Sequence, residues 1–303
     1  MHTDLNIKRG WIEAKLLRFN KSYVEGQKFD GRFSSFTFGV IVVFHLLALT
    51  LGPITFSLAN FLAFFILYII TGLGITLGYH RLLTHKSYIV ENKFLYNAIV
   101  LMGVLALQSE PIEWVIDHAQ HHKGSDTDED PHNSKDGVLW AHVVWVFYKH
   151  LDNELQGRLR QKLQEDSVLV FWSQKSVFIG AQVLLGLLLL AIGGPGMVVW
   201  GIFIRTCFVW HVTWFINSVC HYYGNVAYDT TDNSKNLWWM GLLAFGEGWH
   251  NNHHKFASSP RHGLESHQVD VTYYIIWSLY KLGLVTNLRT VSREVVEKNK
   301  IST

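Results

Sequence analysis

Two long stretches without charged residues limit this chain to a membrane fold. Residues 33–79 and 176–204 contain no Lys, Arg, Asp or Glu. A membrane-spanning helix needs about 20 apolar residues, so each stretch has room for two helices if the second continues to about residue 218. Gly52 and Pro53 offer a turn in the first stretch, and residues 193–196 (GGPG) offer one in the second. The charged share of 17% is also well below the roughly 25% of soluble proteins.

This pattern predicts an all-α integral membrane protein with four transmembrane helices, near residues 36–54, 55–79, 168–192 and 196–218. All 26 Lys and Arg lie outside the two predicted turns. The positive-inside rule therefore places both termini and the central segment in the cytoplasm. Segments 80–167 and 219–303 then form one cytoplasmic cap, and the chain 1–303 is a single domain. Residues 94–109 and 271–284 are apolar but short, so we expect helices on the membrane surface.

Two other classes are disfavoured by the sequence. The first apolar run begins too late and is too long for a cleavable signal peptide. The net charge of +2 is small and indicates no nucleic-acid partner. Cys207 and Cys220 fall on or near the fourth predicted helix, where we expect buried thiols rather than a disulfide. Arg205 falls in the middle of that helix, so it is either functional or a sign that the helix begins later or tilts.

Histidines gather in three boxes beside the apolar stretches. The spacing i, i+3, i+4 puts three side chains on one face of a helix, and it occurs twice. A five-residue spacing does not align on a straight helix, so we expect a helix end that unwinds or bends at the first box. A ninth histidine just after the fourth predicted helix follows Asn217 by four residues, so both point the same way. The nine are His80, His85, His118, His121, His122, His221, His250, His253 and His254.

Nine imidazoles are too many for one ion, because zinc sites take four ligands. They suit two ions with four or five ligands each, and all-imidazole ligation admits Zn, Cu, Fe or Ni. Asp117 and Glu247 lie beside the boxes, so hydrolysis with a carboxylate base stays open. We interpret the acidic run 126–130 as a solvated loop. The isolated histidines are interpreted as interfacial polar residues; they are His45, His142, His150 and His211.

The boxes and their surroundings resemble the membrane fatty-acid desaturases of the stearoyl-CoA and acyl-lipid delta-9 type. The resemblance runs from about residue 72 to 289 and rests on four motifs in order. They are residues 74–82 (GITLGYHRL), 118–133 (HAQHHKGSDTDEDPHN), 214–224 (WFINSVCHYYG) and 246–254 (GEGWHNNHH). The segment 261–265 (RHGLE) looks more like the bacterial and plant branch than the animal one.

The resemblance implies four membrane helices under a cytoplasmic cap that holds two iron ions. The nine histidines would be the ligands, and Asn217 would reach one iron through water. The reaction would be O2-dependent removal of two hydrogens from a long acyl chain, giving a cis double bond. An alkyl C–H bond has no acidity, so a redox metal with O2 has to attack it. Electrons would come from a separate carrier of the ferredoxin or cytochrome b5 type, since no His-Pro-Gly-Gly motif is present.

The same resemblance suggests residues of a substrate tunnel. Trp114, Thr213 and Trp214 match positions around the bend that forces cis geometry, and Gln108 lies toward the headgroup. Tyr68 and Gly72, one helical turn apart, match positions near the methyl end.

The basic residues near the second box bear on what carries the acyl chain. Ile116 and Ala119 replace basic residues of the animal enzymes, and only Lys149 remains of a basic pair. A glycerolipid-bound chain is therefore at least as plausible as acyl-CoA.

Two other functions remain as alternatives. A di-iron membrane hydroxylase could use the same centre. A histidine-rich metal transporter would place its ligands inside helices at the midplane, whereas these boxes lie at one surface.

Overall fold

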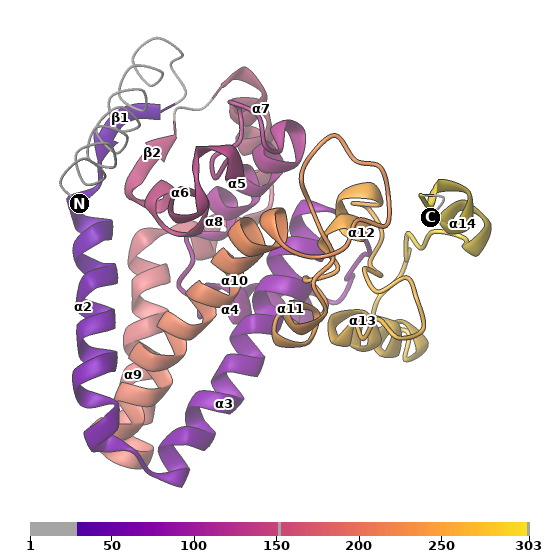
Figure 1. The fold of residues 1–303 in the computed structure, drawn as a ribbon. Coiled ribbons are helices and arrows are strands. Elements are labelled where there is room, and N and C mark those ends of the chain that lie inside the picture. The colour runs from indigo at the N-terminus through magenta and orange to yellow at the C-terminus, as the bar shows by residue number, and fades with distance from the viewer. Residues whose placement is uncertain (1–28, 151–152, 302–303) are drawn as a thin grey trace, which may run out of the picture.

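The computed structural model describes residues 29–150 and 153–301. Long helices stand side by side below a cap of short helices and loops (Figure 1). The long helices are α2 (Ser35–Leu51), α3 (Leu58–Leu73), α9 (Lys175–Val198) and α10 (Arg205–Tyr222). The first 28 residues, expected in the cytoplasm, lie outside the described part of the chain.

The first predicted hairpin is present with slightly different ends. Ser34 and Ser57 cap α2 and α3, and each side-chain oxygen accepts a hydrogen bond from the backbone amide three residues on. A 3-10 turn, Pro53–Thr55 (η1), separates the two helices. After Leu73 the second helix continues as a π-helix, Gly74–Thr84 (η2). The helix therefore continues five residues past the predicted boundary at residue 79.

The second predicted hairpin turns where its glycines lie. Gly194 has φ +74°, a left-handed conformation that glycine adopts without steric cost, and it breaks α9 near its end. The helix then continues through a π-helical segment, Val199–Ile204 (η5), into α10. A separate short helix, α8 (Ser167–Ser173), directly precedes α9 in the chain.

Two continuous helical stretches in the described residues are long and apolar enough to cross a membrane. They are Leu58–Thr84 with 27 residues and Lys175–Tyr222 with 48, the latter containing the break at Gly194. Helix α2 is apolar but has 17 residues, and α4 (Lys93–Val104) has 12. Apolar side chains such as Leu49 (73% exposed) and Leu184 (68%) project outward from the long helices. An apolar surface of this extent suits contact with lipid.

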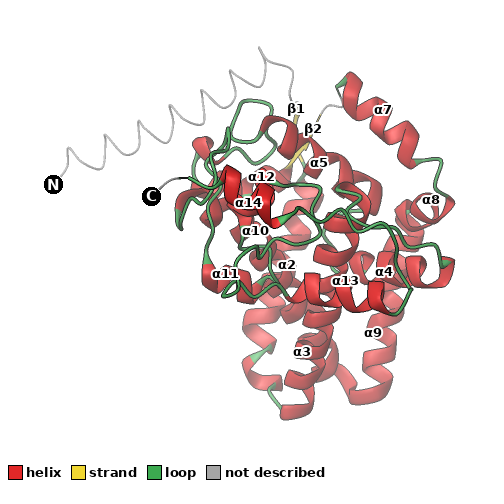
Figure 2. Ribbon diagram, turned by 90° about the vertical axis from the view of Figure 1, so that its right-hand side faces the viewer, coloured by secondary structure: helices red, strands yellow, loops and turns green. Residues whose placement is uncertain are grey.

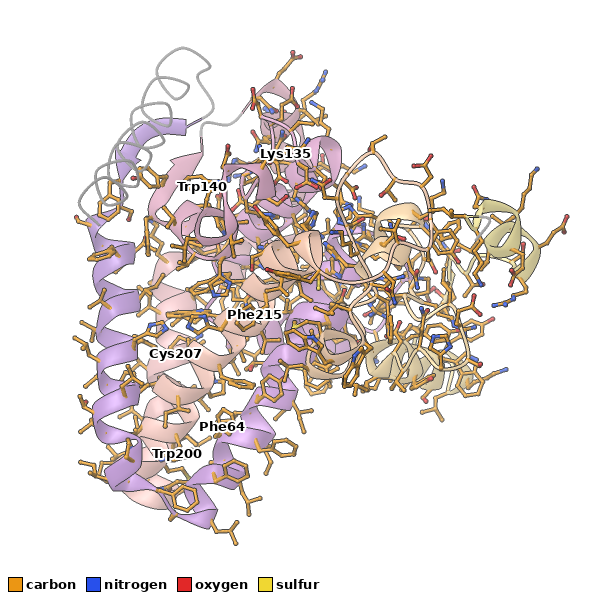
Figure 3. The ribbon with its side chains drawn as sticks, in the orientation of Figure 1. Phe64, Lys135, Trp140, Trp200, Cys207 and Phe215 are labelled. Carbon is orange, nitrogen blue, oxygen red and sulfur yellow. The ribbon has the colours of Figure 1, made fainter. Side chains whose placement is uncertain are left out.

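Aromatic rings fill the space between the long helices. The Phe64 ring lies edge-on to Trp200 at 6.2 Å and to Phe208 at 5.5 Å between centroids, and Figure 3 shows Phe64 and Trp200 between the helices. Cys207 and Cys220 are free and buried, which confirms that they form no disulfide.

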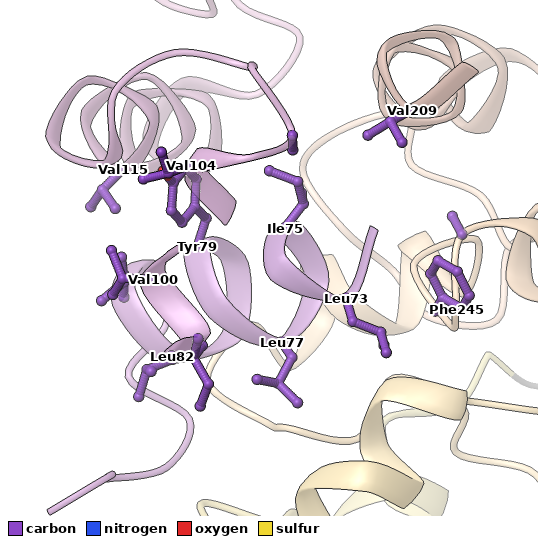
Figure 4. Close-up of a cluster of buried hydrophobic side chains, with 14 of the residues drawn as sticks. Leu73, Ile75, Leu77, Tyr79, Leu82, Val100, Val104, Val115, Val209 and Phe245 are labelled. Atoms are coloured by element: carbon purple, nitrogen blue, oxygen red, sulfur yellow. The ribbon is translucent and has the colours of Figure 1, made fainter. Parts of the chain in front are cut away.

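The main core lies where η2 meets α4, α5 (Pro111–Gly124) and α11 (Trp238–Leu243), and Figure 4 shows part of it. A Cβ atom on Gly74 would lie 2.1 Å from the Met102 carbonyl carbon, so only glycine lets α4 approach this closely. On α4, Gly103 packs in the same way against the Tyr79 ring. This close packing fixes the π-helix that carries the first histidine box.

Arg205 lies within the long helix and is fully buried. Its Nε donates to the Gly201 carbonyl at 3.0 Å, and its Nη1 donates to the Leu105 carbonyl at the C-terminal end of α4. A cation is favourable at a helix C-terminus, because the carbonyl groups there lack helical partners. Arg205 is therefore the first residue of α10, inside a helical stretch that continues from η5, and it binds the end of α4.

The cap contains the remaining elements. Strand β1 (Phe29–Phe33) pairs antiparallel with β2 (Tyr148–His150). Turns of 3-10 helix cover Ser134–Asp136 (η3) and Val144–Phe147 (η4). The short helices are α6 (Val138–His142), α7 (Glu154–Leu163), α12 (His250–Lys255), α13 (Val271–Lys281) and α14 (Arg293–Asn299). The two short helices expected on the membrane surface correspond to α4 and α13.

Candidate metal centre

The π-helix explains the five-residue spacing of the first box. The His85 amide donates to the His80 carbonyl at 3.0 Å, which is an i to i+5 hydrogen bond. This wider turn puts both side chains on one side, with ring centroids 4.7 Å apart. The helix end that we expected to unwind or bend at the first box instead widens into a π-helix. The other boxes lie on α5 and α12 at regular helical spacing, and His221 is in the last turn of α10.

The nine histidines form two groups, in each of which the ligand atoms lie within 4.8 Å of one another. The five-histidine cluster consists of His80, His85, His118, His122 and His253, and the four-histidine cluster of His121, His221, His250 and His254. Both predicted α-helical boxes divide between the clusters. From α5, His121 joins the smaller cluster, and from α12 His253 joins the larger one.

The spacing of the imidazole nitrogens fits metal binding. Neighbouring Nε2 atoms are 3.0 Å apart for His80 and His253, 2.9 Å for His122 and His253, and 3.0 Å for His221 and His250. Two nitrogens bound to one ion at about 2.1 Å lie about 3.0–3.4 Å apart, depending on geometry. Burial lowers the pKa of most of these imidazoles well below the usual value, including His118, His121 and His122. Neutral imidazoles have a lone pair available for a metal.

Carboxylates orient four of the imidazoles from behind. The Nδ1 atoms lie 2.8 Å from Glu247 (His80), 3.0 Å from Asp130 (His121), 2.9 Å from Asp126 (His221) and 2.7 Å from Asp232 (His254). A proton held on Nδ1 by a carboxylate leaves Nε2 free to bind metal and fixes the ring.

Three of these carboxylates, Asp126, Asp232 and Glu247, have a pKa held below the usual value, whereas burial raises the pKa of Asp130 well above it. Burial acts to raise the pKa of Asp232, but hydrogen bonds, first of all from His254, outweigh it and hold that pKa below the usual value. Burial also acts to raise the pKa of Glu247, and the charge of Arg81 outweighs it, so that pKa lies well below its usual range. The Arg81 guanidinium is fully buried and contacts both Glu247 and Asp270.

The interpretation of residues 126–130 as a solvated loop is wrong for two of its carboxylates. Asp126 and Asp130 are 1% and 4% exposed, whereas Asp128 and Glu129 are exposed as expected. The loop folds back under α5 because Asp130 accepts hydrogen bonds from the Asp126 and His132 amides. Their spacing from the second box was visible in the sequence, but the direction of the loop was not.

Two further histidines that the sequence did not single out lie beside the clusters. His262 Nδ1 lies 3.1 Å from Glu247, and its ring packs 4.3 Å from that of His253. His132 Nδ1 lies 3.5 Å from Asp130, and its ring packs 4.2 Å from that of His121. Each cluster therefore has one extra buried imidazole that contacts both a ligand ring and an orienting carboxylate.

Three of the isolated histidines, which the sequence analysis interprets as interfacial polar residues, contact one another. His45 Nε2 lies 3.0 Å from His211 Nε2, and His211 Nδ1 lies 2.9 Å from His142 Nε2. His142 Nδ1 in turn lies 3.1 Å from Ser218 Oγ. This chain of hydrogen bonds joins α2, α10 and α6. The side chain of His150 lies outside the described part of the protein.

An apolar cavity leads to the histidines from between α3, α10 and α11. It brings together five predicted substrate or metal residues, namely Tyr68, Gly72, Trp114, Thr213 and Asn217, with His80, His118 and His250. Phe245, Val212 and Ile216 add apolar lining. A Cβ atom on Gly72 would lie 2.5 Å from the Phe245 ring, so these two residues limit the same end of the cavity.

The other predicted substrate residues lie elsewhere. Gln108 does not line the cavity but supports it: its amide donates to Thr213 Oγ1 at 2.7 Å, and its carbonyl accepts from Trp114 Nε1 at 3.4 Å. Trp214 points away, packing on Trp210 at 5.8 Å and on His142 at 5.8 Å between ring centroids. The adjacent Thr213 faces the cavity because neighbouring helical residues point in different directions. Lys149 lies in β2, and its side chain is outside the described part.

Comparison with known proteins agrees with this geometry. The family described as fatty acid desaturase matches residues 36–272. The sn-1 stearoyl-lipid 9-desaturase of Anabaena variabilis is 47% identical over 80% of this chain and 88% of its own length. The Synechocystis protein of the same name is 45% identical over 74% of this chain and 70% of its own. An acyl-CoA 5-desaturase of Anemone leveillei is 41% identical over 88% and 82%.

The family match spans both hairpins and all nine histidines. Each histidine cluster could hold a metal ion, and the apolar cavity ends at both of them. The chain therefore belongs to the fatty acid desaturase family, whose members are membrane-associated oxidoreductases.

Proposed function

We propose that this desaturase introduces a cis double bond at the delta-9 position of a long saturated acyl chain esterified in a membrane glycerolipid. The observation that carries the proposal is the apolar cavity that ends at both histidine clusters. The five-histidine cluster would hold one iron ion and the four-histidine cluster a second. Asn217, which lines the cavity beside His250, would reach one of them through water.

Iron with O2 supplies the oxidising power that removes hydrogen from an unactivated C–H bond. In balance, the acyl chain loses two hydrogens, and O2 takes these with two electrons and two protons to form two waters. The two electrons would come from a separate ferredoxin or cytochrome b5 type protein. This chain's own residues bind and orient the acyl chain, and they exclude bulk water from the reacting carbons.

The polar corner near the histidines would bend the acyl chain. The Trp114 ring packs against the ligand His118 at 4.9 Å between centroids, and Gln108 links Trp114 on α5 to Thr213 on α10. These contacts tie two walls of the cavity to a metal ligand. The reacting carbons would therefore keep a fixed distance from the ligands, which sets the position of the double bond.

The far end of the cavity would hold the methyl end of the chain. The Tyr68 hydroxyl donates to the Leu243 carbonyl, which fixes its ring across the space between α3 and α11. Gly72 and Phe245 lie next to each other there. Together these three residues would set the longest chain that fits.

Several features favour a lipid-bound chain over acyl-CoA. The relatives from Anabaena and Synechocystis carry names that specify a stearoyl-lipid substrate, whereas the one from Anemone carries an acyl-CoA name. At positions where the animal enzymes have basic residues, this chain has Ile116, which is buried, and Ala119. Without cations at these positions, CoA phosphates lose their strongest partners.

The deciding experiment is expression in a host that lacks the activity, followed by mass spectrometry of its lipids. We expect monoenoic chains with a delta-9 bond on intact glycerolipids before any appear on acyl-CoA. Product appearing first on acyl-CoA would overturn the lipid assignment. A hydroxylated chain without a double bond would favour the hydroxylase alternative.

A further inference from the structure

A second pocket, away from the acyl cavity, has three cations on its rim. It lies between the end of η2, the start of α4, the start of α8 and the segment after α13. Its charged lining residues are Lys86, Lys93 and Arg289, with Glu91 and Asp166.

The two carboxylates of the pocket already have other partners. Asp166 accepts a hydrogen bond from Tyr96 at 2.6 Å and caps α8 through the Val168 amide. Glu91 lies 3.3 Å from the Thr286 hydroxyl, which donates to it.

In the part of the chain that the structure describes, none of the three cations forms an ion pair. Six other cations do, namely Arg81, Lys123, Arg158, Arg160, Arg293 and Lys300. Three unpaired cations around one pocket favour an anionic ligand.

The surroundings of the pocket are apolar and exposed. Phe94, next to Lys93, is 84% exposed, and Ile89 in the lining is 44% exposed. Helix α13 exposes Tyr274, Trp277 and Tyr280, and Lys281 lies over the Trp277 ring. Figure 2 shows α4, α8 and α13 along one side of the molecule, where the cap meets the long helices. Aromatic and apolar side chains at this level are typical of a membrane–water interface.

We infer that this pocket binds the phosphate of an anionic membrane phospholipid through Lys86, Lys93 and Arg289. Basic pockets beside membrane helices on the cytoplasmic side bind anionic head groups in this way. The inference rests on the proposed membrane placement, although it does not need the proposed reaction. The pocket shares no lining residue with the acyl cavity, so the bound lipid would not be the substrate.

An acidic electron carrier is the other candidate, because Lys86 directly follows the metal ligand His85. The exposed Phe94 and α13 aromatics argue against it, since they would place the pocket at lipid rather than in open solvent. The apolar lining residues Ile89 and Val90 likewise suit the acyl and glycerol part of a lipid.

The test is native mass spectrometry of the full-length, delipidated protein in detergent, titrated with phosphatidylglycerol or phosphatidylcholine. Wild-type protein should retain one tightly bound phosphatidylglycerol. Lys86→Gln with Arg289→Gln should weaken it about 25-fold, at about fivefold for each cation. The single change Lys93→Gln, at an exposed first residue of α4, guards against misfolding and should weaken it about fivefold. Arg158→Gln with Lys298→Gln removes the same charge from distant exposed positions and should change nothing.

Each other outcome contradicts the inference. Equal binding of phosphatidylglycerol and phosphatidylcholine would show that the pocket does not select an anionic lipid. Equal binding by the pocket variants and the control would show that these cations do not hold it. Displacement of the lipid by equimolar inorganic phosphate would mean that the pocket recognises free phosphate instead. Unchanged lipid binding with weaker binding of reduced ferredoxin would assign the pocket to an electron carrier. Because lipid binding is measured without turnover, an inactive enzyme would not affect the result.

Discussion

At the scale of single residues, the proposed metal centre depends on which imidazole nitrogen carries the proton. Asp126, Asp130, Asp232 and Glu247 each lie against the Nδ1 atom of a ligand histidine. That arrangement leaves Nε2 available, and in both clusters the Nε2 atoms converge. The carboxylates and the histidines thus form one unit, and a change to either should alter metal affinity.

Removing a ligand should abolish the reaction. The Nε2 atom of His253 lies 3.0 Å from that of His80 and 2.9 Å from that of His122, so His253 is central to the five-histidine cluster. We expect His253→Ala to give no detectable unsaturated product while the protein still inserts into the membrane. His267→Ala, at an exposed position outside both clusters, is the matched control and should keep activity. Near-normal product from His253→Ala would show that this box does not bind metal.

Removing an orienting carboxylate should weaken the binding of one of the two ions selectively. Asp232 contacts only His254 among the ligands, and His254 belongs to the four-histidine cluster. We expect Asp232→Asn to lower the affinity of that cluster about 10–100-fold, with the five-histidine cluster retained. Iron per chain after dialysis against a chelator should then fall from two toward one. The exposed Asp128→Asn should keep both ions, and loss of both from Asp232→Asn would contradict independent clusters.

At the scale of helices, the end of the cavity depends on one glycine. A side chain on Gly72 of α3 would push the Phe245 ring into space that the methyl end would occupy. We expect Gly72→Leu to favour shorter chains by about 10–200-fold, with the double bond at the same distance from the carboxyl end. Phe245→Ala should have the opposite effect and admit longer chains.

Gas chromatography of products from a mixed-length feed measures this change. Gly186→Leu is the control, because nothing lies within 4 Å of the added Cβ on α9. An unchanged length profile in a folded and active Gly72→Leu protein would mean that Gly72 only lets α3 pack closely, the common role of small residues in membrane helices.

The histidine chain between α2, α10 and α6 should contribute to stability rather than to chemistry. His45 Nδ1 lies 2.7 Å from the Ile41 carbonyl and so donates to it, which leaves Nε2 to accept from His211. His45→Leu would leave the His211 donor without a partner, at a cost of about 1–3 kcal/mol. We expect a lower melting temperature than for His267→Ala, with desaturation retained. Loss of product at full stability would instead point to a role in the reaction.

The elements of this fold differ in how far their sequence determines them. The regular spacing of the histidines was enough to predict that the three side chains of each helical box lie on one face of its helix. The glycines at 193–196 were enough to predict the turn of the second hairpin. The π-helix could not be inferred, because it forms where Gly74 and Gly103 let α4 pack closely, a long-range contact. For the same reason the sequence did not indicate the five-and-four division of the ligands or the buried position of Asp126 and Asp130. These depend on loops that fold back from distant segments.

At the scale of the whole molecule, the position of the metal centre constrains how the chain lies in a membrane. His85 on the π-helix and His118 on α5 have Nε2 atoms 3.3 Å apart, so both boxes lie on one side. The apolar α4 between them has 12 residues, too few for a span of about 20, and it must return to the side where it began. If the four long helices each cross the membrane, as we predict from the sequence, the cap and both ends of the described chain lie on the same side.

Accessibility of single cysteines should reveal which side that is. Asp136 is exposed in the cap, and Ile54, 78% exposed, lies at the turn between α2 and α3. Because Lys and Arg are absent from both hairpin turns, we expect the turns outside and the cap in the cytoplasm. A membrane-impermeant maleimide should then label Ile54→Cys in intact cells and Asp136→Cys only in inverted vesicles. The buried Cys207 and Cys220 are first changed to Ser, and the double-Ser protein serves as the unlabelled control. Labelling of Asp136→Cys from the outside alone would reverse the orientation, and labelling of both positions from one side would exclude the four-span arrangement itself.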